Sequence, residues 1–197
     1  MRLRIRWLGN SCIEIKNKRH ILIDPNFIAE PEGVADVILI THEHDDHFSP
    51  KAINYGKEVY APKPAIKVFN IQAKEVKEGM RIGNILVTKS FCWKSEYSVG
   101  YLIEDEFKIL HLGDSFKSMG IETDLIFTPI FKEYHDQILD MIKICHAKCA
   151  IPIHFDYFRA EKKELAEKLV EKIRLMGVGS RILVPGKWIQ VKELLEK

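Results

Sequence analysis

The 197-residue sequence lacks three features that would place it in a specialised class of protein. Its four cysteines (Cys12, Cys92, Cys145 and Cys149) are too few and too scattered to indicate a disulfide framework. No run reaches the roughly 20 apolar residues of a membrane span, so we expect no membrane partner. The formal net charge of +2 is too small to favour nucleic acid or an anionic membrane as a partner.

The first residues also lack the apolar centre and small-residue cleavage site of a signal peptide. Basic and apolar residues alternate from Met1 to Trp7, which is typical of a first strand. We therefore expect a cytoplasmic protein. Hydrophobic residues make up 46% of the sequence and charged residues 29%, a balance that predicts a globular protein with a substantial core. The length predicts a single domain over residues 1–197.

Short apolar runs and turn residues predict an α+β fold. Helices are predicted to begin near residues 49 and 62, and two more are predicted around residues 138–145 and 161–176 from their apolar spacing. A last hairpin is predicted over residues 182–191. Strand-rich halves with helices outside them indicate two sheets packed face to face and covered by helices. Strands are predicted at residues 3–8, 12–15, 20–23, 37–40, 58–61, 85–88, 98–103, 107–112, 125–127 and 150–153.

The densest chemical signal is the run Thr41-His42-Glu43-His44-Asp45-Asp46-His47, which directly follows a continuously apolar strand. Three imidazoles and three carboxylates are costly to bring together without a cation. These side chains are ligands of zinc and also of iron, manganese and nickel. Because alternate side chains of an extended segment share a side, His42 and His44 are predicted to face one ion. Asp46 and His47, beyond the turn, are then free to face a neighbouring ion.

This run resembles the His-x-His-x-Asp-His signature of the metallo-β-lactamase superfamily, without a gap, and the likeness extends over nearly the whole chain. The compact branch that includes ascorbate-6-phosphate lactonase-like proteins is the most similar. The resemblance implies a four-layer αββα sandwich of two mixed β-sheets, with the metals at one edge between the sheets. Four further segments carry it: Trp7-Leu8-Gly9-Asn10-Ser11, Ile21-Leu22-Ile23-Asp24-Pro25, His111-Leu112-Gly113-Asp114 and Ile151-Pro152-Ile153-His154.

The resemblance also implies the ligands and the chemistry. One or two divalent ions are expected, with zinc preferred and manganese, iron or nickel as alternatives. One ion would be held by His42, His44 and the bridging Asp114, and the other by Asp46, His47, Asp114 and His154. A metal-bound hydroxide would attack the substrate, and Asp46 is the expected catalytic residue that orients the water or passes its proton. Asp24 is expected to orient a ligand without touching metal.

Two departures from the family pattern affect the first ion. The family supplies another histidine between the two halves, but residues 89–97 read Lys-Ser-Phe-Cys-Trp-Lys-Ser-Glu-Tyr. Cys92, Lys94, Glu96 or the more distant His135 are the candidate replacements, with water as another option and a buried, inert Cys92 as the simpler interpretation. Asn10 stands where related sequences often carry histidine. We therefore expect one tightly held ion, and the sequence leaves the occupancy of the second ion site undecided.

The leading hypothesis is a metal-dependent hydrolase that acts on a lactone, ester or phosphodiester of a small metabolite. The alternatives are a metal-dependent nuclease, which the near-neutral charge disfavours, and a non-catalytic metal-binding or sensing protein with a degenerate site. Cys145 and Cys149 are expected to be buried, while His111 lies either near the site or within a sheet; the oligomeric state is left open. Candidate pocket residues are Phe91, Trp93, Tyr97, Phe131, Tyr134, Tyr157 and Phe158, with Lys94, Lys132 or Arg159 for an anionic group.

Overall fold

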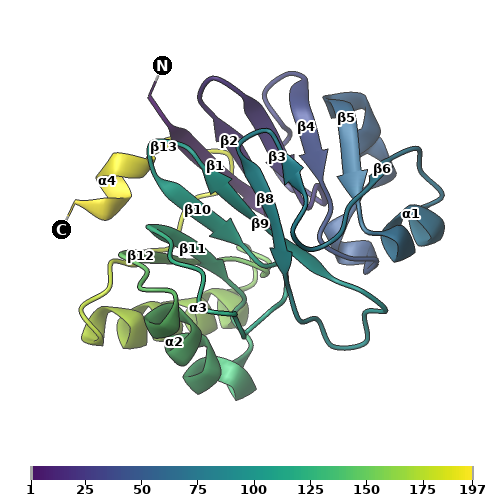
Figure 1. Ribbon diagram of the computed structural model, residues 1–197. Helices are drawn as coiled ribbons and strands as arrows, with labels where there is room; N and C mark the ends of the chain where they lie inside the picture. Colours follow the sequence, from purple (N-terminus) through teal and green to yellow (C-terminus); the bar gives the residue numbers. More distant parts are fainter. Residues whose placement is uncertain (1, 197) are drawn as a thin grey trace.

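The computed structural model describes residues 2–196, whose strands form two sheets packed face to face (Figure 1). In spatial order, the first sheet contains β13 (Ile189–Gln190), β1 (Arg4–Gly9), β2 (Cys12–Lys16), β3 (His20–Ile23), β4 (Ala35–Leu39), β5 (Gly56–Ala61) and β6 (Lys74–Glu75). The second contains β12 (Cys149–Pro152), β11 (Leu125–Thr128), β10 (Lys108–His111), β9 (Val99–Glu104), β8 (Ile85–Lys89) and β7 (Arg81–Ile82).

Both sheets are mixed. In the first sheet the pairs from β13 to β3 are antiparallel and those from β3 to β6 are parallel. In the second sheet the pairs from β7 to β10 are antiparallel, whereas β10, β11 and β12 run parallel. Each sheet therefore has a group of parallel strands whose carboxyl ends point the same way. Loops that leave such ends are a common place for binding and catalytic residues.

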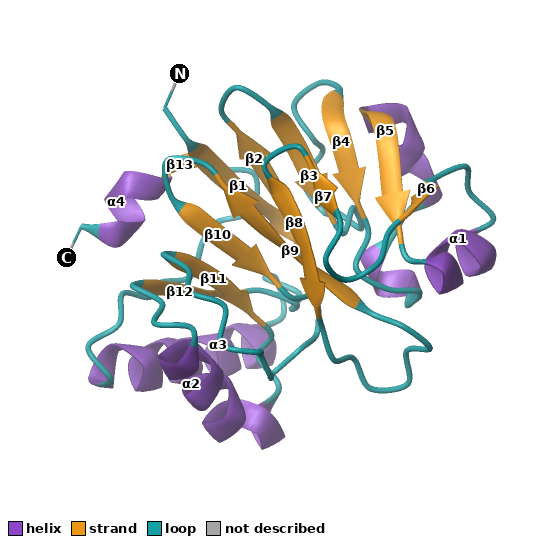
Figure 2. Cartoon of the chain, viewed as in Figure 1, coloured by secondary structure: helices purple, strands orange, loops and turns teal. Residues whose placement is uncertain are grey.

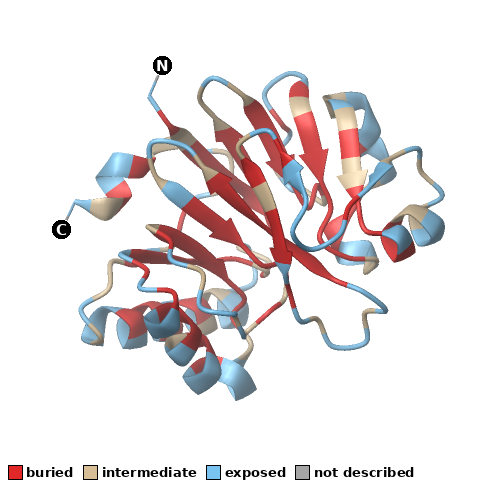
Figure 3. Cartoon of the chain, in the orientation of Figure 1, coloured by how far each residue is buried: buried red, intermediate tan, exposed pale blue. Residues whose placement is uncertain are grey.

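The alternation of side chains along each strand explains the two apolar clusters. Ile5 and Trp7 of β1 face the core between the sheets, while Leu8 joins a second cluster on the outer face of the first sheet. In β4, Val37 faces the core and Ile38 faces the outer cluster, so both faces are covered. This confirms that the continuously apolar run is buried on both sides. Figure 3 shows the strands of both sheets as mostly buried and the outer sides of the helices as exposed.

Helices cover the outer faces of the two sheets (Figure 2). Helix α1 (Lys63–Phe69) and the 3-10 helix η2 (Pro50–Tyr55) contribute Ala65 and Ala52 to the cluster on the first sheet. Helices α2 (His135–Ile144) and α3 (Ala160–Leu175) pack on the second sheet, and α4 (Val191–Leu195) lies beside β13. The layers are thus helix, sheet, sheet and helix, and the predicted αββα sandwich is confirmed. None of the helices within residues 2–196 is long and apolar enough to cross a membrane.

The prediction of a C-terminal hairpin over residues 182–191 is wrong. Only Ile189–Gln190 forms a strand there, and it pairs with β1. The preceding segment is held by the buried side chain of Leu183 and by a hydrogen bond from the Gly186 amide to the Trp7 carbonyl at 2.8 Å. Pro185 has no amide hydrogen to contribute to a ladder of hydrogen bonds. This explains why the residues on its two sides do not pair as a hairpin.

Candidate metal centre

The predicted ligands leave the carboxyl ends of parallel strands in both sheets. His42 follows β4 and Asp114 follows β10, while His154 follows β12. Two hydrogen bonds join the sheets beside this point. The Tyr101 hydroxyl donates to the carbonyl of Ile40 at 2.7 Å, and the Val99 amide donates to the carbonyl of Thr41 at 2.9 Å. The loop that carries the histidines is therefore fixed to both sheets at its base.

All six predicted ligands come together in two adjacent groups. The first group contains His42, His44 and Asp114, joined by Cys92, and one donor atom from each residue lies within 4.8 Å of every other. The second group contains Asp46, His47 and His154. These two groups match the division into two ion sites that the resemblance implies, and they add a thiol to the first of them.

The carboxylate of Asp114 faces both groups. Its Oδ2 lies 3.7 Å from Nε2 of His42 in the first group. Its Oδ1 lies 2.9 Å from Nε2 of His47 and 3.0 Å from Nε2 of His154 in the second. Nε2 of His154 also lies 3.1 Å from Oδ2 of Asp46. One carboxylate thus presents a separate oxygen to each group, an arrangement that allows it to bridge two ions.

Buried atoms without partners show that the residues fit a cation. Among the described residues, Nε2 of His42, Nε2 of His47 and Oδ1 of Asp114 are buried and make no hydrogen bond. Nε2 of His47 and Oδ1 of Asp114 are close together and yet are not aligned for a hydrogen bond. Donor atoms that approach one another without pairing fit the ligands of a shared ion, because leaving them unsatisfied is otherwise costly.

Asp24 lies behind the second group and is fully buried. Its carboxylate accepts hydrogen bonds from the amide and the hydroxyl of Thr41, both at 2.7 Å, and faces Nδ1 of His47 at 2.8 Å. Burial would raise the pKa of Asp24, but the facing His47 outweighs it and the pKa lies below its usual value. This geometry matches the expected orienting role for Asp24, because the bond to Nδ1 directs Nε2 of His47 toward Asp114.

Burial and neighbouring charges also shift the pKa values of His42, Asp114 and Cys92. Burial and the neighbouring His47 lower the pKa of His42 to about 4, so this imidazole is neutral at physiological pH and has a free lone pair. The pKa of Asp114 is far below its usual range, because the facing histidines outweigh the effect of burial. Burial and the nearby carboxylates, Asp114 foremost, raise the pKa of the Cys92 thiol when no cation is present.

Two backbone features place the ligands. Gly113 has φ +59°, and a Cβ at this residue would lie 2.7 Å from Oγ1 of Thr41. A residue without a side chain is therefore needed where β10 passes the histidine loop. His154 itself has a left-handed backbone with φ +63°, and its amide donates to the carbonyl of Asn10 at 2.7 Å. Asn10 thus holds the backbone of His154, the predicted ligand that follows β12.

Most other candidates lie outside the two groups. Neither His135 nor Glu96 belongs to a group, and the ammonium of Lys94 lies over the ring of Trp93 at 4.2 Å. Cys145 and Cys149 are buried in the core, as predicted. His111 packs within the second sheet, where Nε2 contacts the Ser11 carbonyl at 2.9 Å and Nδ1 accepts the Gly113 amide.

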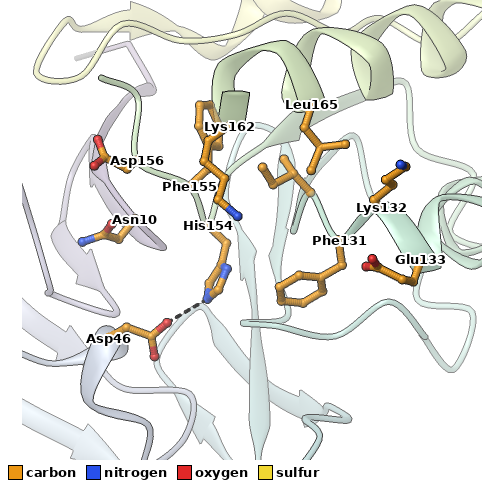
Figure 4. Close-up of a pocket in the computed structure, with 11 residues that line it drawn as sticks. Asn10, Asp46, Phe131, Lys132, Glu133, His154, Phe155, Asp156, Lys162 and Leu165 are labelled. Carbon is orange, nitrogen blue, oxygen red and sulfur yellow. Dashed lines mark hydrogen bonds and ion pairs between the residues drawn. The ribbon is translucent and has the colours of Figure 1, made fainter. Parts of the chain in front are cut away.

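Two pockets, each of about 460 Å³, open beside the ligands. The first lies against Asp46 and His154 and is shown in Figure 4. The second lies against both groups and is lined by four aromatic rings, of which those of Phe116 and Tyr134 stack at 4.0 Å. Of the seven predicted aromatic residues, Trp93, Phe131 and Tyr134 line this second pocket. Phe91 and Tyr97 line a separate pocket that also borders Cys92, and Tyr157 and Phe158 line none of the three.

Phe116 and Lys162 are among the pocket residues that the sequence predictions missed. Of the cations predicted to bind an anionic group, Lys132 lines the first pocket, but Arg159 pairs with Asp156 at 3.4 Å instead. Lys162 lies on the first turn of α3, and its side chain extends into the pocket toward His154 (Figure 4). No local pattern distinguishes it from the other lysines of this charged helix.

Comparison with known proteins identifies the family. The family model of the β-lactamase superfamily domain matches residues 4–154. A UPF0173 protein of Pyrococcus abyssi is 29% identical over 98% of this chain and 96% of its own length. A UPF0173 metal-dependent hydrolase of Thermoplasma acidophilum is 26% identical over 93% of this chain and 95% of its own. A metallo hydrolase from the archaeon Ignicoccus hospitalis has the same fold, with a TM-score of 0.74, 17% identity, and coverage of 96% of this chain and 98% of that one.

The fold and the clustered ligands define a metal-dependent hydrolase. The chain belongs to the metallo-β-lactamase superfamily. The likeness to ascorbate-6-phosphate lactonase-like proteins stays a prediction, as do the metal, the number of ions and the substrate.

Proposed function

We propose that the protein hydrolyses a lactone, ester or phosphodiester bond in a small anionic metabolite at a two-ion centre, with zinc as the resident metal. The observation that carries this proposal is the position of Asp114, which presents one oxygen to His42 and the other to His47 and His154. Imidazole and carboxylate donors suit zinc. A bound divalent ion supplies a nucleophile at neutral pH, because it lowers the pKa of water from about 16 to about 7, and it polarises the oxygen that becomes negative.

Asp46 is the proposed catalytic residue. Half of its side chain is exposed, and it faces the pocket from beside His154. The hydrogen bond with His154, foremost, holds the pKa of Asp46 below its usual value, so the carboxylate is ionised at neutral pH. An ionised carboxylate at this position orients a water molecule and accepts its proton. The nearby His154 imidazole holds Asp46 in place for this task.

Lys162 is the proposed recognition residue for an anionic group on the substrate. Its ammonium enters the pocket that also contains Asp46 and His154, so a substrate held there has its anionic end next to the reacting bond. Asp156, which lines the same pocket, pairs with Arg159, which offsets part of its negative charge. The aromatic second pocket provides room for the apolar part of the substrate or of the leaving group.

Turnover of a panel of lactones, esters and phosphodiesters, each with and without a phosphate or carboxylate, tests this proposal. We expect hydrolysis of at least one anionic member, its loss after treatment with a chelator, its return with zinc, and a large loss in Asp46→Ala. Asp45→Ala, an exposed neighbour outside both groups, is the matched control and should retain activity. Metal binding without turnover of any member would instead favour the non-catalytic metal-binding or sensing alternative.

A further inference from the structure

The loop over residues 90–98 is fastened to the histidine loop. The Glu43 carboxylate accepts hydrogen bonds from the hydroxyl of Ser95, at 2.8 Å, and from the amide of Glu96. Within the loop, the amide of Cys92 donates to the hydroxyl of Ser98 at 3.1 Å. These bonds fix the loop, and so they hold Cys92 in its place within the first group.

The thiol of Cys92 lies at ligand spacing from the other members of this group. Its Sγ is 3.7 Å from Nδ1 of His44 and 3.9 Å from Oδ2 of Asp114. Oδ2 of Asp114 is in turn 3.7 Å from Nε2 of His42. Neighbouring nitrogen, oxygen and sulfur ligands of a tetrahedral zinc ion are about 3.5 Å apart, given zinc–nitrogen and zinc–sulfur bonds of about 2.0 and 2.3 Å. The four atoms therefore need only a small contraction to enclose an ion.

A buried atom without a partner points independently to a ligand at this place. The His42 side chain is fully buried, and its Nδ1 is engaged by the Thr41 hydroxyl at 2.9 Å. Its Nε2 makes no hydrogen bond within residues 2–196 and lies 3.7 Å from Oδ2 of Asp114, another member of the first group. The other proposed replacements, Glu96 and His135, contribute no atom to the group.

We propose that the Cys92 thiolate is the fourth protein ligand of the first ion site, in place of the histidine that residues 89–97 lack. This rests on the proposed function, because it presumes the metal centre. Binding forms a sulfur–metal bond and releases the thiol proton to water, with no change of oxidation state. A thiolate is a soft ligand, so the first site selects zinc, cobalt or cadmium over manganese and magnesium. The chain then has two unlike sites, one with a sulfur ligand and one with nitrogen and oxygen ligands only.

Cobalt(II) binding to the full chain, kept reduced and first stripped of metal, tests this assignment. Cobalt bound by nitrogen and oxygen ligands gives weak visible absorption bands, whereas a cobalt–thiolate bond adds a strong near-ultraviolet charge-transfer band. We expect this strong band in the wild type and in Cys149→Ala, a control that removes a thiol buried in the core. Cys92→Ser should lose the band, keep the visible bands of the other ion, and bind the ion of the first site about tenfold more weakly or worse.

A second variant guards against a merely structural effect. Cys92→His restores a nitrogen ligand at the same position, so it should bind two ions, lack the charge-transfer band, and accept manganese better relative to zinc than the wild type does. Visible cobalt bands in the wild type without the charge-transfer band would overturn the role of Cys92 and leave the proposed function intact. If the wild type binds no cobalt at all, the metal centre fails and this inference fails with it.

Discussion

The carboxylate of Asp24 lies 2.8 Å from Nδ1 of His47, on the side of the ring away from Asp114. The imidazole of His47 thus faces a carboxylate at each of its nitrogens, with a hydrogen bond to Asp24 at Nδ1 and Asp114 close to Nε2. Asp24 is itself fixed by the amide and hydroxyl of Thr41, which immediately precedes the histidine run. These buried hydrogen bonds from Thr41 through Asp24 therefore fix the orientation of the His47 ring.

Asp24→Asn should weaken metal binding without removing a ligand. The amide can offer a hydrogen to Nδ1, which favours the wrong tautomer of His47 and places the proton on Nε2. We expect a loss of 10–100-fold in the affinity of the second site, about what is typical when the partner of a metal-bound histidine is lost. Competition with a fluorescent chelator measures this. An unchanged affinity, with the fold intact by circular dichroism, would contradict the orienting role of Asp24.

Gly113→Ala should destabilise the fold and disturb the first site. The new methyl group would lie 2.7 Å from Oγ1 of Thr41, in a residue with φ +59°. Gly33→Ala is a matched control, because Gly33 also has a positive φ, +81°, but no atom within 4 Å of the added Cβ. We expect about 1 kcal/mol of lost stability in the control and about 2–3 kcal/mol in Gly113→Ala. Urea unfolding measures both, and equal losses would show that crowding by Thr41 is unimportant.

Lys162→Ala should raise the KM for an anionic substrate about tenfold and change kcat little, because it removes one charged contact that substrate and transition state share. Lys163→Ala is the control, since Lys163 lies over the ring of Tyr157 instead of in the pocket. Steady-state kinetics with the hydrolysed member of the panel and its uncharged analogue separate the two effects. An equal rise in KM for both compounds would argue against recognition of charge by Lys162.

Glu14 provides a test of stability that is independent of metal. Its fully buried carboxylate pairs with Arg6 and lies 2.6 Å from Nε2 of His20. Burial opposes ionisation, but His20 and Arg6 outweigh it, so the pKa of Glu14 is lowered in the folded state. A lowered pKa adds stability above the unfolded value of about 4.3, and this stability is lost as the pH falls through the folded value.

Glu14→Gln should therefore cost about 3 kcal/mol at neutral pH, and the difference from the wild type should shrink below about pH 4. Thermal unfolding across this pH range measures the difference. Glu58→Gln, which removes an exposed pair with Lys74, is the control and should change the curve little. A difference between wild type and Glu14→Gln that stays constant down to pH 3 would contradict the pairing of an ionised Glu14.

Much of the fold and the centre of the site followed from local sequence. Alternation and continuous apolar runs predicted most strands, because burial of one or both faces determines those patterns. The candidate ligands from His42 to His47 could be named from the sequence because they are nearly contiguous. Asp114 and His154 were found through the family resemblance, since strand-end residues so far apart in sequence meet only when both sheets are packed.

The predictions are wrong or incomplete where contacts between distant parts of the chain determine the structure. The false hairpin near Pro185 arose because apolar residues were interpreted as a strand, whereas within this segment only Ile189–Gln190 pairs with β1 as a strand. Phe116 and Lys162 enter pockets that form between separate elements, and nothing in their neighbourhood marks them. For Cys92 the sequence left open both a ligand and an inert, buried thiol; the thiol lies beside His44 and Asp114 because Glu43 holds the 90–98 loop.

Anomalous scattering at the zinc edge, from crystals of protein purified without added metal and then soaked with zinc, tests the two-ion centre most directly. We predict two peaks, one between His42, His44 and Asp114 and the other between Asp46, His47 and His154. A crystal that shows no peak at these residues, or only peaks elsewhere on the surface, would contradict the account.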